Sequence, residues 1–329
     1  MNCAVVQNII NMRHNILITS AGKRVALVKA FKETLSRFFP DAKVYTTDMN
    51  PLMAPAAYVS DGCISVPRVT SEDYIGILQE ICLKYDIGLV VPTIDTELAI
   101  LSANKAIFEE IDTHLCVSEY DFIMMCRDKR NTGAFFEKNG IRVPRPIDKY
   151  NPRFPMFAKP YDGSLSSNLH YIRTAEDLTA EIMADPKLIF MEYIDKSKYQ
   201  EYTVDMYFGR DNQLKMAVPR ERIEIRAGEI NKGRTVKEFL EPYVHKHLSF
   251  IEGCEGCICG QFFCNKENND VVGIEINPRF GGGYPLSYAA GANYTEFLIR
   301  EYFLEESISY SDSWKDGMLM LRYDDAIFV

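Results

Sequence analysis

The sequence predicts an α/β domain with a doubly wound parallel sheet, followed by a larger α+β region. Strand and helix patterns alternate up to about residue 118, which is typical of a parallel sheet with helices on both faces. After Pro144 and Pro146 the pattern changes to mostly strands, interrupted by two helical segments. The chain has 329 residues, which is enough for two or three packed units.

In the first region, short apolar runs that end in turn residues predict five strands. Helical periodicity separates them, and Leu27, Phe31 and Leu35 share one face of the first predicted helix. Ser71 is the expected N-cap of a later helix. The predicted strands are 15–20, 43–47, 62–66, 87–91 and 114–117, and the predicted helices are 25–35, 74–82 and 96–107.

The second region begins with two short helices within residues 119–140, broken near Asp128 and stopped at Gly140. Strands are then predicted at 156–159, 170–172, 188–193, 201–208, 215–218, 258–264 and 271–276, with helices at 176–183 and 236–248. We expect an N-terminal tail over 1–12, a doubly wound domain over 13–118, a small unit over 119–190 and a large unit over 191–329.

The charge of the chain argues against nucleic acid and membrane partners. The net charge is -9 and the pI about 5.2, so phosphate backbones and anionic membranes are not generally attracted. No apolar run approaches the roughly 20 residues of a membrane span, and residues 1–12 lack the pattern of a signal peptide. Met12 is an alternative translation start. We expect a cytoplasmic protein that acts on small molecules, and homo-oligomerisation stays open.

The nine cysteines are an odd number, which favours reduced thiols in the cytosol. Four of them are clustered, namely Cys254, Cys257, Cys259 and Cys264. C-x-x-C is a metal-ligand spacing, but no second pair completes a ligand set. We therefore favour small apolar side chains on or near a strand.

Two lysines are candidates for binding phosphate. Lys159 ends an apolar strand, where a buried charge is costly without an anionic partner. Lys129 follows Asp128 at the break between the two short helices. The loop after Lys159 contains small and hydroxyl residues, namely Gly163, Ser164, Ser166 and Ser167. Such a loop lets backbone N–H groups approach an anion, although an ordinary polar hairpin explains the same residues.

Polar side chains share one face of two predicted strands near the C-terminal end of the second region. Glu275 and Asn277 are two residues apart, so they point to the same face, and Gln261 lies in a neighbouring strand. Three oxygen donors suit Mg²⁺, or Mn²⁺ in its place. Arg279 can project to the same side at the strand end. A salt bridge between Glu275 and Arg279 is the simpler alternative, but it does not explain the other donors.

Taken in order, these residues resemble the ATP-grasp superfamily. The order is Lys129, Lys159-Pro-x-x-Gly-Ser, Glu192-x-Ile194, Glu201, Gln261 and Glu275-x-Asn277-Pro-Arg279. The chain looks most like single-copy relatives of the carbamoyl-phosphate synthetase large subunit, from about residue 13 to the C-terminus. The segment Pro92-Thr93-x-Asp95-x-Glu97-Leu98 also resembles the N-terminal domain of that group.

The resemblance implies an ATP-grasp fold in which a doubly wound domain precedes a small and a large subdomain, with ATP between the last two. Lys129 and Lys159 would bind the ATP phosphates, and the loop with Gly163, Ser164, Ser166 and Ser167 would act as a lid. The backbone of Glu192, Tyr193 and Ile194 would bind adenine, and Glu201 the ribose. Gln261, Glu275 and Asn277 would bind Mg²⁺, and Arg279 would face the transferred phosphoryl group.

The activity implied by the resemblance is ligation of a carboxylate, activated by ATP as an acyl phosphate, to an amine or a thiol. A single ATP-grasp unit without a glutaminase argues against carbamoyl phosphate synthesis. The lid has one glycine where relatives often have several, so its phosphate contacts stay open. The alternatives are a phosphotransferase without ligation and a nucleotide-binding module without turnover. A nicotinamide dehydrogenase is disfavoured, because the first turn, residues 20–24, lacks the G-x-G-x-x-G motif.

The segment 219–229 carries alternating charges. Arg226 could pair bidentately with a substrate carboxylate, or lie on an exposed strand. For Arg220 and Arg222 we favour the exposed strand.

Overall fold

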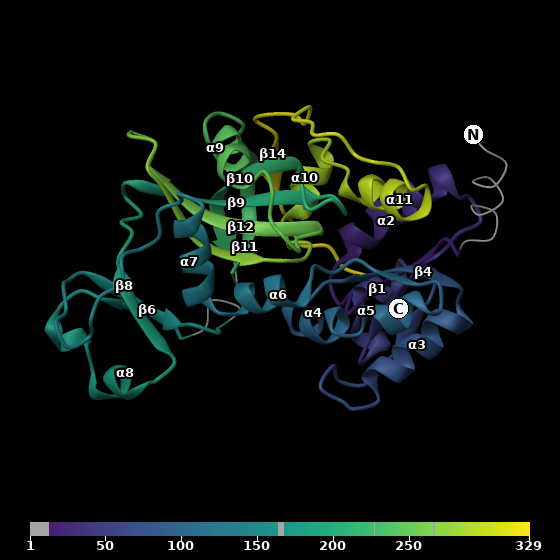
Figure 1. The fold of residues 1–329 in the computed structure, drawn as a ribbon, viewed down its shortest axis with the longest axis horizontal. Coiled ribbons are helices and arrows are strands. Elements are labelled where there is room, and N and C mark those ends of the chain that lie inside the picture. The colour runs from purple at the N-terminus through teal and green to yellow at the C-terminus, as the bar shows by residue number, and fades with distance from the viewer. Residues whose placement is uncertain (1–12, 164–167, 227, 266) are drawn as a thin grey trace.

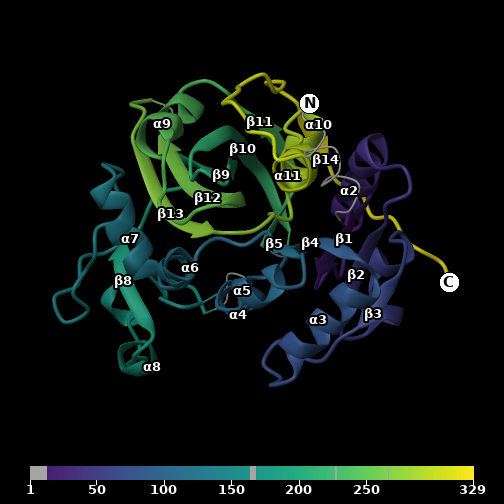
Figure 2. The same ribbon diagram turned by 45° about the vertical axis from the view of Figure 1, so that its right-hand side comes forward.

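The computed structural model describes residues 13–163, 168–226, 228–265 and 267–329. It contains one five-stranded, one six-stranded and one three-stranded sheet. The three-stranded sheet with β6 and β8 lies at one end of the molecule and the sheet with β1 at the other (Figures 1 and 2). The six-stranded sheet lies between and above them in Figure 1. The expected tail over 1–12 and the lid residues Ser164, Ser166 and Ser167 lie outside the described residues.

The N-terminal domain has the strand order β3-β2-β1-β4-β5, with every neighbouring pair parallel. This confirms the predicted doubly wound sheet. Its elements are β1 (Asn15–Thr19), α2 (Val25–Phe38), β2 (Val44–Asp48), η1 (Pro51–Met53), η2 (Pro55–Tyr58), β3 (Cys63–Ser65), α3 (Tyr74–Lys84), β4 (Ile87–Pro92), α4 (Asp95–Ser102), α5 (Lys105–Glu109) and β5 (His114–Leu115).

The small unit has two helices followed by an antiparallel sheet of order β7-β6-β8. Asp128 separates the helices as predicted, because its side chain caps the second one by accepting from the Arg130 N–H. The elements are α6 (Tyr120–Arg127), α7 (Lys129–Lys138), β6 (Met156–Pro160), β7 (His170–Ile172), η3 (Ala175–Asp177), α8 (Ala180–Ala184) and β8 (Leu188–Glu192).

The large unit is built on an antiparallel sheet of order β13-β12-β9-β10-β11-β14. No helix in the described parts of the chain is long and apolar enough to cross a membrane. The elements are β9 (Tyr199–Phe208), β10 (Leu214–Arg226), β11 (Glu229–Thr235), α9 (Leu240–His247), β12 (Gly256–Asn265), β13 (Val271–Asn277), α10 (Tyr284–Ala289), α11 (Tyr294–Phe303) and β14 (Leu319–Leu321).

Two local predictions were wrong. Ser71 does not cap α3: the helix begins at Tyr74 after Asp73, and the Ser71 hydroxyl instead donates to the Asp73 carboxylate. Arg220 and Arg222 do not lie on an exposed strand, because β10 is an internal strand paired with β9 and β11, and both residues are buried. Alternating charges cannot tell an edge strand from an internal one, since the pairing partners are distant in sequence.

The clustered cysteines are packing residues. Cys257, Cys259 and Cys264 lie within β12 and Cys254 just before it, and all four side chains are buried. Cys254 and Cys264 belong to a core that fills one face of the large sheet, together with residues such as Phe262. Their positions agree with the interpretation that they are small apolar side chains on or near a strand.

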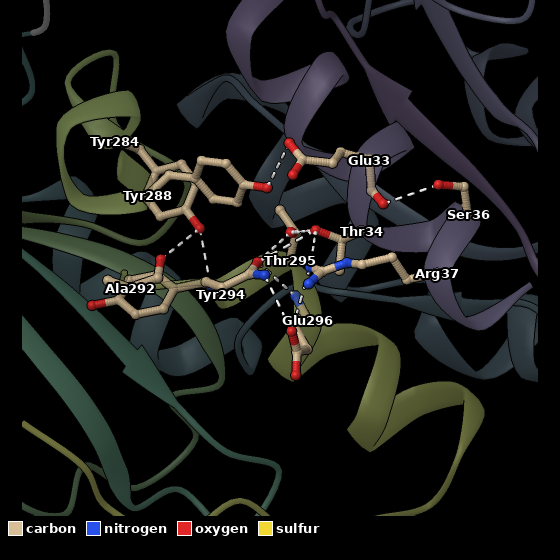
Figure 3. A network of polar contacts seen from close by, with 11 residues as sticks. Glu33, Thr34, Ser36, Arg37, Tyr284, Tyr288, Ala292, Tyr294, Thr295 and Glu296 are labelled. Atoms are coloured by element: carbon tan, nitrogen blue, oxygen red, sulfur yellow. Dashed lines mark hydrogen bonds and ion pairs between the residues drawn. The ribbon is translucent and has the colours of Figure 1, made fainter. Parts of the chain in front are cut away.

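Helix α2 joins the N-terminal domain to α10 and α11 of the large unit. Figure 3 shows the polar contacts at this interface: the Thr34 and Thr295 hydroxyls are 2.7 Å apart, and Tyr288 donates to Glu33 at 3.2 Å. Beneath them, Phe31 of α2 packs in the same apolar core as residues of α11. The N-terminal domain therefore shares a core with the large unit.

Candidate active site

The three predicted metal ligands meet on one face of the large sheet. Gln261 of β12 lies directly opposite Glu275 of β13 in the antiparallel register, so the two side chains share a face. Asn277 follows two residues after Glu275, and its amide donates to Glu275 Oε1 at 3.2 Å. The strand spacing therefore brings together one carboxylate and two amide oxygens.

Lys129 and Lys159 place positive charge beside this carboxylate. Lys129 Nζ lies 3.6 Å from Glu275 Oε2 and donates to the Gly163 carbonyl oxygen at 2.5 Å. Burial alone would raise the pKa of the Glu275 carboxyl, but the charges of Lys129, Lys159 and Arg279, with the Asn277 hydrogen bond, hold that pKa below its ordinary value. The carboxylate is therefore kept ionised, as a metal ligand must be.

Lys159 is a buried cation at the end of β6, with 8% of its surface exposed. Burial is the main reason that its pKa is lowered to about 8, and nearby Lys129 lowers it further, while Glu275 opposes the shift. Burying the Lys159 ammonium costs free energy, and a bound anion at this position would offset that cost.

The predicted adenine segment lies at the end of β8. The Glu192 carboxylate is held by Arg142 and, at 2.7 Å, by Arg145, and the Glu192 N–H donates to the Arg145 carbonyl. Both oxygens of the Glu192 carboxylate are therefore already bound by arginines of the small unit. The Tyr193 ring lies 4.3 Å from the Tyr171 ring, and Ile194 is buried.

The predicted ribose residue, Glu201, lies on β9, away from the small sheet. Its Oε1 is 2.9 Å from Nη1 of Arg222 on β10, and Lys196 lies 3.9 Å from its other oxygen. Among the described residues, no hydrogen bond or ion pair joins Glu201 to Glu192. Glu192 is the last residue of β8 and Glu201 the third residue of β9, so the two are close in sequence.

Arg279 contacts the N-terminal domain. Its Nη2 lies 3.1 Å from the Asp95 carboxylate, at the first residue of α4, and not against Glu275 as the salt-bridge alternative expected. Burial would lower the pKa of the Arg279 guanidinium, but Asp95, Cys259 and Glu275 together raise that pKa above its ordinary value. Arg279 shares the lining of one cleft with Gln261 and Asn277, which places it beside two of the metal-ligand candidates.

Arg226 is not among the residues that line this cleft. Its side chain is 69% exposed and lies 3.1 Å from Asp324 near the C-terminus. The structure thus brings together Lys129, Lys159, Gln261, Glu275, Asn277 and Arg279, and leaves Arg226 outside this group.

Sequence reasoning missed a buried ion pair behind the cleft. Arg220 on β10 binds Asp205 on β9 bidentately at 2.7 and 2.8 Å, and the Ser287 hydroxyl donates to the same carboxylate at 2.6 Å. Arg220 and Asp205 are 2% and 0% exposed. The signal in the sequence was the apolar run 216–219, which leads directly into Arg220.

Two family models match the chain. The model described as PylC-like, N-terminal domain matches residues 16–116, and the model described as ATP-grasp in the biosynthetic pathway with Ter operon matches residues 184–324. No curated protein matches the sequence.

Several solved structures have a similar fold. The biotin carboxylase domain of Hydrogenobacter thermophilus 2-oxoglutarate carboxylase has a TM-score of 0.70 at 13% identity, over 93% of this chain and 73% of that one. N5-carboxyaminoimidazole synthetase from Staphylococcus aureus, complexed with ADP, has 0.69 at 17%, over 92% and 79%. L-amino acid ligase from Bacillus licheniformis has 0.64 at 15%, over 88% and 74%. The chain belongs to the ATP-grasp superfamily and carries a PylC-like N-terminal domain.

Proposed function

We propose that this protein is an ATP- and magnesium-dependent ligase that activates a carboxylate as an acyl phosphate and joins it to an amine, or to another nucleophile such as a thiol. The observation that carries the proposal is the meeting of Glu275, Asn277 and Gln261 with two lysines beside the cleft that Arg279 lines. A site built only to bind a nucleotide does not require this arrangement.

The residues fit a magnesium ion bound together with phosphates. The described residues contain no group of three or more His, Cys, Asp or Glu suited to a metal, so one carboxylate and two amide oxygens would have to serve. Magnesium usually binds through one or two carboxylates, substrate phosphates and water, which agrees with this set. When bound there, the ion would neutralise charge on the phosphate oxygens.

The other residues would position ATP. Lys129 and Lys159 would hold its phosphates beside Gly163. The backbone from Tyr193 to Ile194 would contact the adenine, and Glu201 the ribose. The S. aureus neighbour is described as complexed with ADP, and the H. thermophilus one with MgADP, which supports a nucleotide in this fold.

The chemistry begins with a carboxylate, which is a poor electrophile because its anion resists attack. A carboxylate oxygen would attack the γ-phosphorus of ATP, and the bond to the ADP oxygen would break, which leaves an acyl phosphate. An amine would then attack the carbonyl carbon, the bond to phosphate would break, and the nitrogen would lose a proton. Arg279 would neutralise charge on the transferred phosphoryl group.

The experiment is ADP release from the full-length protein, with amino acids and small acids supplied singly and in pairs with amines. We expect release that depends on both an acid and a nucleophile. Release with an acid alone, accompanied by a stable phosphorylated product, would make the protein a phosphotransferase. Nucleotide binding without release would make it a binding module.

Asn277→Ala is the companion variant for this assay. Because it removes one amide oxygen of the proposed metal site, we expect a higher magnesium concentration for half-maximal ADP release, with little change in ADP affinity. A wild-type magnesium profile would remove Asn277 from the ligand set.

A further inference from the structure

The cleft that Arg279 lines is small and polar. Its volume is about 100 Å³, and its lining includes three arginines, Arg220, Arg222 and Arg279, and one carboxylate, Glu229. It adjoins the metal-ligand candidates, because Gln261 and Asn277 line it as well. A molecule in this cleft would therefore lie beside the phosphates of the nucleotide.

Each of the three arginines has one carboxylate partner, and the partner of Arg222 is Glu201. Arg220 is paired with Asp205, and Arg279 with Asp95. The one lining carboxylate, Glu229, is itself held by Lys23 at 3.3 Å and Arg322 at 3.0 Å. Much of the negative charge of Glu229 is therefore already offset by Lys23 and Arg322.

Arg222 has an unfilled donor. Its Nη1 pairs with Glu201 at 2.9 Å and its Nη2 donates to the Gly228 carbonyl at 2.8 Å. Its side chain is only 7% exposed, and its buried Nε has no hydrogen-bond partner among the residues that the structure describes. Buried donors of this kind are rare in proteins, because desolvation without a partner is costly. The position therefore lacks an acceptor that a ligand would supply.

The N-terminal domain adds positive charge at the same place. The Arg24 guanidinium makes a long contact of 3.5 Å with the Thr93 carbonyl. Its pKa is lowered mainly by burial and then by the charge of Arg279, while Glu229, Cys259 and Asp95 oppose the shift. Arg24 therefore adds to the positive charge around Arg279, which favours an anion there.

We propose that this cleft binds a substrate with two acidic groups: Arg279 faces the carboxylate that is activated, and Arg222 Nε donates to a second carboxylate. The ligand class is a small dicarboxylate or an acidic amino acid. This inference rests on the proposed ligase function and names its acid substrate. A site that hydrogen-bonds an acidic group rejects the analogue that lacks this group, because the arginine donor is then left without an acceptor.

The test is calorimetric binding to the full-length protein with Mg²⁺ and ADP present. The probes are L-aspartate, L-glutamate, succinate and glutarate, each compared with an analogue that lacks the second acidic group, namely asparagine, glutamine, butyrate and valerate. We expect at least one diacid to bind about 10- to 100-fold more tightly than its analogue. If no diacid is preferred, the inference fails, while ADP release with a monocarboxylic acid and an amine would leave the ligase function intact.

Variants of Arg222 assign the preference to this residue. Arg222→Met should reduce the ratio of diacid to analogue affinity to near one, and Arg222→Lys, which keeps the charge but has no Nε donor in that position, should reduce it in part. Lys232→Met is the matched control, since Lys232 lies on β11, is 45% exposed and pairs with Glu224; its ratio should stay at the wild-type value. Because both affinities are measured in the same variant, their ratio is not affected by a loss of ADP affinity through Glu201. If Arg222→Met fails to fold, an unchanged ratio in Arg222→Lys would overturn the assignment of the preference to Arg222.

Discussion

Arg279 is the residue whose chemistry the proposed mechanism depends on most. Arg279→Met should lower turnover about 100- to 1000-fold, because a preorganised donor is lost where charge is redistributed, while ADP affinity changes little. The melting temperature should fall only slightly, since the Asp95 carboxylate is 22% exposed and can be solvated. Steady-state ADP release and thermal unfolding on the same preparation provide the measurement. A stable variant with near-normal turnover would exclude the catalytic role.

Lys159 should couple stability to pH. Its pKa is lowered to about 8 in the folded protein from an ordinary 10.5, so above pH 8 the folded state holds fewer protons than the unfolded state. Stability should therefore rise with pH in this window, by roughly 2–3 kcal/mol between pH 7 and pH 10, relative to Lys159→Met.

Denaturant unfolding of wild type and Lys159→Met at several pH values tests this coupling. Lys29→Met, at an exposed position of α2, is the control and should follow the wild-type pH profile. Parallel profiles of wild type and Lys159→Met would mean that the Lys159 ammonium is not buried in solution.

At the scale of elements, the pairing of β9 with β10 contains the ion pair between Asp205 and Arg220. Arg220→Met should destabilise the protein by about 3–5 kcal/mol, because it leaves a buried carboxylate without its cation. The guanidinium is closely packed as well: a Cβ at Gly283 would lie 2.0 Å from Arg220 Nη1. The free energy of unfolding measures the effect.

The double variant Arg220→Met with Asp205→Leu separates charge from packing. It should lose less stability than Arg220→Met alone, since no isolated charge remains, although the Ser287 hydroxyl loses its acceptor. Equal losses in the single and double variants would show that packing of the Arg220 side chain, not the ion pair, dominates.

At the scale of the whole molecule, the N-terminal domain takes part in the site. Asp95→Ala should lower turnover about 10- to 100-fold with little change in the KM for ATP, because Arg279 loses the charge-assisted hydrogen bond that positions it. Asp95→Asn keeps one acceptor and should recover part of the activity. Kinetics of both variants, beside the exposed control Glu109→Ala, give the comparison. Equal losses of kcat in all three would refute a positioning role for Asp95.

The shared core explains how such a contact is held in place. Helix α2 packs with α10 and α11, and the apolar cluster that contains Phe31 also contains Tyr294 and Leu298. This core crosses the predicted domain boundary at residue 118. Asp95 and Arg279, 184 residues apart in sequence, are therefore held on one rigid scaffold.

Most of the fold class could be predicted from the sequence, because periodicity and turn residues act over a few positions. The alternation in 13–118 predicted the parallel sheet, and Asp128 predicted the break between α6 and α7. The two-residue spacing of Glu275 and Asn277 predicted their shared face, since side chains alternate along a strand.

Only the tertiary structure decided which charged groups meet. Asp95 became the partner of Arg279, and Arg220 became a buried residue, because the pairing of β10 with β9 and β11 and the approach of Asp95 to Arg279 depend on the path of the whole chain. The unfilled Nε of Arg222 likewise arises from contacts with Glu201 and Gly228 on other segments. Local sequence determines which faces are apolar and where strands begin and end, whereas the pairing of charges is set by residues that are distant in sequence and adjacent only after folding.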